Sequence, residues 1–292
     1  MPFLQIRVLS RHPEFAEELL LANGADSVSL IDAGDDPVLE PAPGATPLWP
    51  RTVAIGLFPA DTDPARVTAN LREYLPDGGQ VQITTDPVED RDWVRNWIEN
   101  CPPMKFGKRL WVCPHQRIIE ETGCETVLLD PGLAFGTGTH PSTALCLEWL
   151  AEQDDLEDKE VIDFGCGSGI LGIAALKLGA ARCTSVDIDP QAITATRDNA
   201  EQNDVDDRLH VLAHDAPFSA FEVDVVLANI LARPLMELAP TLGASVRRGG
   251  ALVLAGLLDR QAEEVRRAYA DAFDFEPDVS RDGWKRLVAR RR

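Results

Sequence analysis

The chain has 292 residues, of which 45% are apolar, enough for two ordinary domains with packed cores. Its formal net charge of −20 excludes strong affinity for nucleic-acid backbones and favours basic partners. An acidic surface also suits a protein from a salt-rich cell, and charge alone leaves both interpretations open. No stretch has the roughly 20 apolar residues that cross a membrane, and no secretion leader is evident, so we expect a cytoplasmic protein.

The six cysteines contain no C-x-x-C pair, and the five histidines form no ligand pattern with them. We therefore expect reduced thiols and no metal site. Monomer is the default expectation for the oligomeric state.

Residues 1–86 alternate in the order strand, helix, strand, strand, helix, strand. The expected elements cover residues 3–9, 12–24, 26–32, 51–58, 64–75 and 79–86. This order predicts a ferredoxin-like α+β domain. The segment contains no convergent catalytic residues, so we expect it to recognise the substrate.

Residues 87–104 predict a helical linker. Trp93 and Trp97 are four positions apart and give the helix one apolar face, and two prolines at 102 and 103 end it. An amphipathic helix packed on a neighbouring domain explains this pattern better than an aromatic ligand site does.

Residues 105–292 predict a Rossmann-like α/β domain, because strands and helices alternate through them. The last segment reads as two strands around an Asp282-Gly283 turn. The expected sheet is therefore mostly parallel, with an antiparallel hairpin at its C-terminal end.

The stretch "VIDFGCGSGILG" (161–172) joins a buried strand to a helix and points to a nucleoside site. Gly165, Gly167 and Gly169 let a ligand approach the backbone at the start of the helix. Asp187 ends the next strand 20 residues after Gly167, the spacing at which an acid meets ribose hydroxyls. We expect an adenosine-type ligand here.

Two cofactors fit that description. NAD is a competitor, because residues 167–172 match G-x-G-x-x-G. Three features favour S-adenosylmethionine: the closing hairpin, a single mononucleotide-binding half, and Asp163 inside the strand, where a carboxylate can hold the amino group of a methionine tail. The glycine loop with "VDIDP" resembles the motifs of class I methyltransferases that use S-adenosylmethionine.

Two further strands end in polar residues. Asp215 is placed either near the adenine amino group or as an ordinary turn residue. Asn229, in "VLANIL", ends the strand at the sheet edge that faces the donor sulfur. The resemblance to methyltransferases that act on amino nitrogens, which often carry an Asn or Asp here, implies that it positions a substrate amine. A purely structural role for Asn229 is the alternative.

The stretches "LDPGLAFGTGTHPST", "VIDFGCGSGILGIAALKLGA", "DIDPQAI", "ANIL" and "DRDWVRNW" together resemble the ribosomal protein L11 methyltransferase family over essentially the whole chain. The resemblance implies methylation of lysine side chains and the N-terminal α-amine of that basic ribosomal protein. It also implies substrate recognition by the N-terminal domain and cofactor contacts from Thr143, Gly165, Asp187 and Asn229. On this reading "GTGTHPST" folds over the donor, and His140 is a helix cap or packing residue, not a general base.

Other functions remain open at this point. They are an NAD-linked oxidoreductase, a non-catalytic adenosine sensor, and a methyltransferase acting on another protein or small-molecule amine. A nucleic-acid methyltransferase is disfavoured by the charge and by the lack of a basic patch.

Overall fold

The computed structural model describes residues 3–34, 47–77, 81–88, 102–130, 136–154, 156–213 and 222–292. The chain divides into two compact units, Met1–Asp92 and Trp93–Arg292. The expected linker helix with Trp93 and Trp97, and the expected site residue Asp215, lie outside the described residues.

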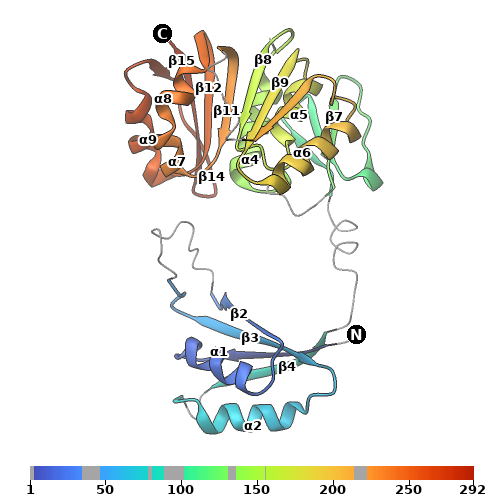
Figure 1. Cartoon of the computed structure of the whole chain (residues 1–292), viewed down its shortest axis with the longest axis vertical. Helices are drawn as coiled ribbons and strands as arrows, with labels where there is room; N and C mark the ends of the chain where they lie inside the picture. Colours follow the sequence, from blue (N-terminus) through green and yellow to red (C-terminus); the bar gives the residue numbers. More distant parts are fainter. Residues whose placement is uncertain are drawn as a thin grey trace. The chain divides into compact units, whose positions relative to one another are not determined.

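The N-terminal unit is ferredoxin-like, as predicted. Its elements are β1 (Phe3–Leu9), α1 (Pro13–Ala22), β2 (Ser27–Asp32), β3 (Thr52–Pro59), α2 (Pro64–Tyr74) and β4 (Gln82–Val88). The four strands form an antiparallel sheet in the order β2-β3-β1-β4, with both helices on one face (Figure 1). The core between them includes Ile6, Leu20, Phe58 and Leu71, all fully buried.

The main sheet of the C-terminal unit has the order β10-β9-β8-β11-β12-β15-β13, with β14 paired to β15. The first five strands are parallel, whereas β15 runs antiparallel to both β12 and β13. This confirms the predicted mostly parallel sheet with an antiparallel end. The strands are β8 (Glu160–Phe164), β9 (Arg182–Asp187), β10 (Leu209–Ala213), β11 (Val223–Asn229), β12 (Val246–Leu258), β13 (Phe273–Phe275), β14 (Val279–Arg281) and β15 (Trp284–Arg291).

The hairpin between β14 and β15 closes through two residues, as the Asp-Gly pair predicts. Asp282 and Gly283 have φ of 51° and 79°, and Arg281 pairs with Trp284 across the turn. Positive φ at both central residues gives the turn the twist of the flanking strands.

Helices cover both faces of the sheet (Figure 1). One apolar core contains residues of α4, α5 and α6, and a second contains residues of α7, α8 and α9. The helices are α4 (Pro141–Glu152), α5 (Ile170–Lys177), α6 (Pro190–Gln202), α7 (Ala232–Glu237), α8 (Ala239–Ala244) and α9 (Ala262–Tyr269). The sequence predicts one helix over 234–246, but the structure has α7 and α8. Pro240 explains the break, because it has no N–H to continue the ladder.

Three short strands form a separate sheet, which alternation alone did not predict. They are β5 (Met104–Phe106), β6 (Leu110–Cys113) and β7 (Glu125–Leu128), in that order. Their apolar residues join the core of α4 and α5 instead of extending the main sheet. Strand β5 was not expected from the sequence, because three residues are too few to show a period.

Candidate active site

The glycine loop connects β8 to α5 at the carboxyl edge of the parallel strands. Gly165, Gly167 and Gly169 all have positive φ, at 75°, 55° and 80°. A Cβ on Gly169 would lie 2.7 Å from Thr196 Cγ2, so neighbouring atoms leave no room for one. The Thr196 hydroxyl also donates to the Gly167 carbonyl at 2.9 Å, which anchors the loop on α6. The loop is therefore fixed, and Gly165 and Gly167 are part-exposed glycines at which a ligand can approach the backbone.

Asp187 closes this loop from the end of β9. Its Oδ2 accepts the Gly167 N–H at 2.9 Å, and its Oδ1 accepts the Asp189 N–H at 3.0 Å. Each carboxylate oxygen has a second lone pair for a ligand hydroxyl. The structure thus brings together two of the residues expected to bind the cofactor.

Ile188, which follows Asp187, was missed by the sequence reasoning. Its side chain is 75% exposed, which is unusual for a large apolar residue at the end of a buried strand. The sequence signal for it is an apolar residue between two acids in "VDIDP", because this position places an apolar side chain beside the acid expected to bind the ribose.

Asp163 lies in the middle of the sheet, beside Leu227 on one strand and Ser185 on the other. Only 1% of it is exposed, and its Oδ2 accepts the Gly172 N–H at 2.9 Å. Burial raises the pKa of Asp163 to about 7, and the negative charge of Asp187 adds to that rise. A positive group bound nearby would therefore favour the ionised form of this carboxyl at neutral pH.

Gly172, the last glycine of the motif, serves packing. A Cβ there would lie 2.8 Å from Cys183 Sγ and 3.3 Å from Asp163 Oδ2. The glycine lets α5 approach the sheet closely enough for its backbone to hold the Asp163 carboxyl.

Thr143 and Asn229 meet at the same edge of the sheet. Thr143 is in the first turn of α4 and is 1% exposed, and Asn229 is the last residue of β11. Asn229 Nδ2 donates to Thr143 Oγ1 at 3.0 Å. Asn229 Oδ1 is buried and has no hydrogen-bond partner among the described residues. A buried acceptor without a partner is costly, so its presence marks a place where a donor is expected to bind.

The segment before α4 contacts the glycine loop, so the two glycine-rich stretches of the sequence also meet in the structure. The Ser168 hydroxyl donates to the Gly136 carbonyl at 2.6 Å. Residues 131–135 of this first stretch lie outside the described part of the chain.

His140 caps α4, in agreement with the sequence interpretation. Its Nδ1 accepts the Ser142 N–H at 3.3 Å, and its ring packs edge-on against Trp284 with centroids 4.5 Å apart. Burial lowers the pKa of His140, which keeps the ring neutral and able to accept that hydrogen bond. These contacts account for the histidine without a role as a base.

A family model described as ribosomal protein L11 methyltransferase (PrmA) matches residues 2–292. The chain belongs to this family. A relative named ribosomal protein L11 methyltransferase from Shewanella amazonensis is 49% identical, covering 100% of this chain and 99% of its own. One of the same name from Edwardsiella ictaluri is 52% identical over 99% of each chain. The chain is therefore a methyltransferase, and the oxidoreductase interpretation is wrong.

A solved structure supports the fold of the PrmA family member described here. The crystal structure titled ribosomal protein L11 methylase, from Lactobacillus delbrueckii subsp. bulgaricus, is 29% identical with a TM-score of 0.59. It covers 65% of this chain, and the match takes in 98% of its own residues.

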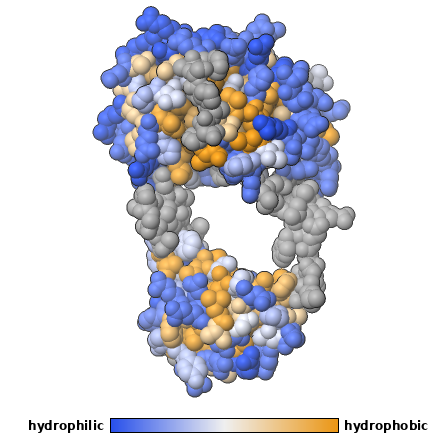
Figure 2. Space-filling model, in the orientation of Figure 1, coloured by the Kyte–Doolittle hydropathy of each residue, from blue (hydrophilic) through white to orange (hydrophobic). Residues whose placement is uncertain are grey.

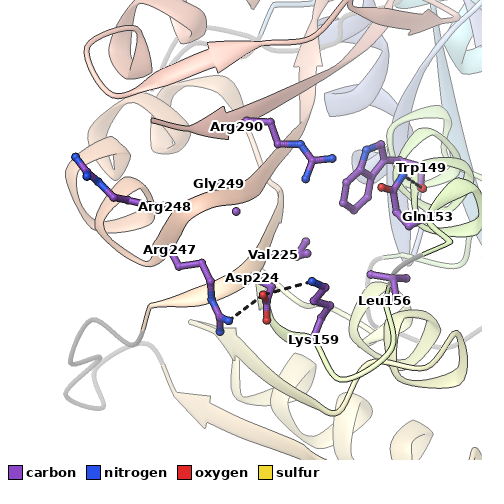
Figure 3. Close-up of a pocket in the computed structure, with 11 residues that line it drawn as sticks. Trp149, Gln153, Leu156, Lys159, Asp224, Val225, Arg247, Arg248, Gly249 and Arg290 are labelled. Carbon is purple, nitrogen blue, oxygen red and sulfur yellow. Dashed lines mark hydrogen bonds and ion pairs between the residues drawn. The ribbon is translucent and has the colours of Figure 1, made fainter.

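A hollow of about 220 Å³ lies at the opposite edge of the main sheet, where β8 and β11 begin (Figure 3). Lys159 and Arg247 both face Asp224, and Arg247 Nη1 lies 2.9 Å from Asp224 Oδ1. Asp224 Oδ2 also accepts the Glu160 N–H at 2.8 Å. Asp224 thus pairs with both basic residues and connects the beginnings of neighbouring strands. The hollow is separate from the candidate site, which lies at the carboxyl ends of the strands.

Proposed function

We propose that this protein transfers methyl groups from S-adenosylmethionine to lysine side chains and the N-terminal α-amine of ribosomal protein L11. Membership of the PrmA family over residues 2–292 supports the reaction and the substrate. The observation that carries the mechanism is the buried Oδ1 of Asn229, which has no hydrogen-bond partner in the described part of the chain and offers an acceptor to an incoming amine.

The residues at the carboxyl edge fit the donor. The glycine loop offers backbone without side chains, and Asp187 would bind the ribose hydroxyls with Ile188 beside the adenine. Thr143 and Asn229 would lie at the methyl-transfer end, and Asp163 would attract the amino group of the methionine tail. Asp215, expected near the adenine, keeps that role only as a prediction, since it lies outside the described residues.

When bound, S-adenosylmethionine supplies a methyl group on a positively charged sulfur, so the protein need not activate a leaving group. What the protein must supply is orientation and a neutral amine. A pH of 7 lies about 3.4 units below the pKa of a free lysine, so deprotonating the lysine ammonium costs roughly 4 to 5 kcal/mol. Deprotonating an α-amine costs about 1 kcal/mol. Desolvation lowers that cost, because it disfavours the ammonium form.

Asn229 suits this task because its amide is uncharged. A carboxylate in its place would stabilise the ammonium form and oppose transfer. The Oδ1 atom would accept one amine hydrogen and direct the lone pair toward the methyl group, while Thr143 holds Nδ2.

We assign substrate recognition to residues 1–86, with 87–104 as the linker and 105–292 as the catalytic domain. The sheet of the N-terminal unit has its helices on one face, and the other face carries a cross-strand row of apolar residues. In that row Leu9 pairs with Val53, and Val53 pairs with Ile31. These three side chains are absent from the helix-side core, since they alternate with it along each strand. Figure 2 shows apolar residues reaching the surface of this unit. Leu9 and Ile31 are half-buried and Val53 is 9% exposed, so the face offers part-exposed apolar side chains on which a protein could pack.

We also propose that the reaction takes place in the cytoplasm, because the proposed substrate is a ribosomal protein. No helix within the described residues has the length and apolar character to span a membrane.

The test uses radiolabelled donor, purified ribosomal protein L11 and the Asn229→Ala variant. We expect turnover to fall far more than donor affinity measured by calorimetry, since the amine loses its acceptor. Full turnover with normal donor binding would show that Asn229 has no such role. Labelling a ribosomal extract gives the second arm, and a labelled band other than L11 would contradict the substrate.

A further inference from the structure

The turn that follows Asn229 rests directly on the neighbouring strand β12. Gly256 in β12 has φ of 80°, and the pairing of β12 with β15 shifts register between Leu254 and Leu257. A Cβ on Gly256 would overlap the Ile230 carbonyl oxygen and lie 2.8 Å from its carbon and 3.0 Å from its nitrogen. All three contacts are with backbone, which cannot move aside as a flexible side chain can.

The same turn is held from its other side by the donor loop. A Cβ on Gly165 would overlap Cγ2 of Ile230. The Ile230 side chain thus lies against the glycine loop, while its peptide lies against Gly256. Asn229 immediately precedes Ile230 and pairs with Ala255, the residue before Gly256.

We propose that Gly256 is a positioning residue for methyl transfer. The bulge around it forms a seat for the Ile230 peptide, and this seat sets the position of the Asn229 amide. Bulges commonly re-aim side chains beside active sites. The inference rests on the proposed role of Asn229.

A side chain at residue 256 would lift the Ile230 peptide. Contacts of 2.8 to 3.0 Å must open to an ordinary carbon contact, a shift of about 1 Å at the turn. A misplacement of about 1 Å in a catalytic constellation can lower the rate about 100-fold. The Asn229 amide would still be present, but it would no longer meet the amine correctly.

Gly249→Ala is the matched control for Gly256→Ala. Gly249 is in the same strand with φ of 75°, yet nothing lies within 4 Å of a Cβ built on it. Both variants therefore bear the same kind of left-handed strain, and only Gly256→Ala meets the Ile230 backbone. We expect kcat on ribosomal protein L11 to fall about 100-fold in Gly256→Ala and by less than about threefold in Gly249→Ala. Equal kcat in the two variants would overturn the proposal.

A double-mutant cycle with Asn229→Ala separates positioning from general loss of structure. If Gly256 acts through Asn229, adding Gly256→Ala to Asn229→Ala lowers kcat little further. Additive losses would refute the seat while leaving the role of Asn229 intact. No loss in Asn229→Ala itself would instead refute the proposed function.

If Gly256→Ala does not fold, the turn is tested directly by comparing Ile230→Gly with Ile230→Ala. Both remove the contact with Gly165, but only the glycine frees the backbone that sits on Gly256. We expect kcat of Ile230→Gly to be about fivefold below that of Ile230→Ala, because a more flexible peptide at residue 230 no longer stays in contact with Gly256. Equal values would overturn the proposal.

Discussion

Asn229 and Thr143 are 86 residues apart in the chain and are joined by a hydrogen bond of 3.0 Å from Asn229 Nδ2 to Thr143 Oγ1. The bond links the end of β11 to the first turn of α4. It uses one N–H of the amide and fixes its orientation, and the amide oxygen is the atom that we propose accepts a hydrogen bond from the substrate amine.

Replacing Thr143 by valine tests this arrangement, because valine keeps the shape and removes the hydroxyl. Asn229 then loses the bond that fixes its amide, and we expect kcat to fall roughly 10-fold, about the worth of one hydrogen bond. Thr143→Ser retains the hydroxyl and should stay near wild type. Steady-state methylation of ribosomal protein L11 measures both, and a Thr143→Val enzyme as fast as Thr143→Ser would contradict the prediction.

Asp163 gives the protein a pH-dependent stability. Burial raises the pKa of this carboxyl from 3.8 to about 7, so the folded state keeps a proton that the unfolded state loses between those values. The stability contribution of Asp163 therefore falls as pH rises from about 4 to about 7. Asp163→Asn cannot lose that proton, and we expect it to gain stability over wild type on moving from pH 5 to pH 8, on the order of a few kcal/mol.

Thermal unfolding at pH 5 and pH 8 checks this expectation. Donor affinity supplies the second measurement, since the ammonium of the methionine tail favours the ionised carboxyl. Wild type should bind the donor more tightly at pH 8 than at pH 6, whereas Asp163→Asn should bind weakly at both. If wild type and Asp163→Asn responded to pH in the same way, ionisation of Asp163 would not be the cause of the pH dependence.

His140→Ser distinguishes a cap from a base. Serine caps helices well, so α4 should keep its first turn, and the lost packing on Trp284 should cost about 1 kcal/mol. We expect kcat within about threefold of wild type, whereas loss of a general base lowers rates about 100- to 10,000-fold. The kcat value at pH 7.5 and a melting curve decide between the two roles.

The sequence predicted those parts of the site that local spacing controls. Gly165, Gly167 and Asp187 follow from a strand-turn-helix pattern and one fixed interval, and Figure 1 shows the resulting layers. The partnership of Asn229 with Thr143 could not be predicted in this way, because it depends on the pairing of β11 with its neighbours and on the position of α4. The seat at Gly256 was hidden for the same reason, since a glycine inside "LVLAGLL" does not reveal which backbone lies against it.

The acidic charge is concentrated where we place substrate recognition. Residues 1–86 carry 5 Lys and Arg against 13 Asp and Glu, a net charge of −8 out of −20 for the whole chain. If this charge attracts a basic substrate, added salt must weaken that attraction, because the Debye length shortens from about 10 Å at 0.1 M to about 3 Å at 1 M. We expect the KM for ribosomal protein L11 to rise several-fold between 0.05 and 0.5 M NaCl, while the donor Kd changes by less than about twofold, because a small ligand is held by contacts much shorter than the Debye length. Salt adaptation predicts the opposite trend, with activity and melting temperature both rising as salt is added, since counterions then relieve repulsion among the carboxylates. Steady-state kinetics and melting curves across the same salt series separate the two explanations.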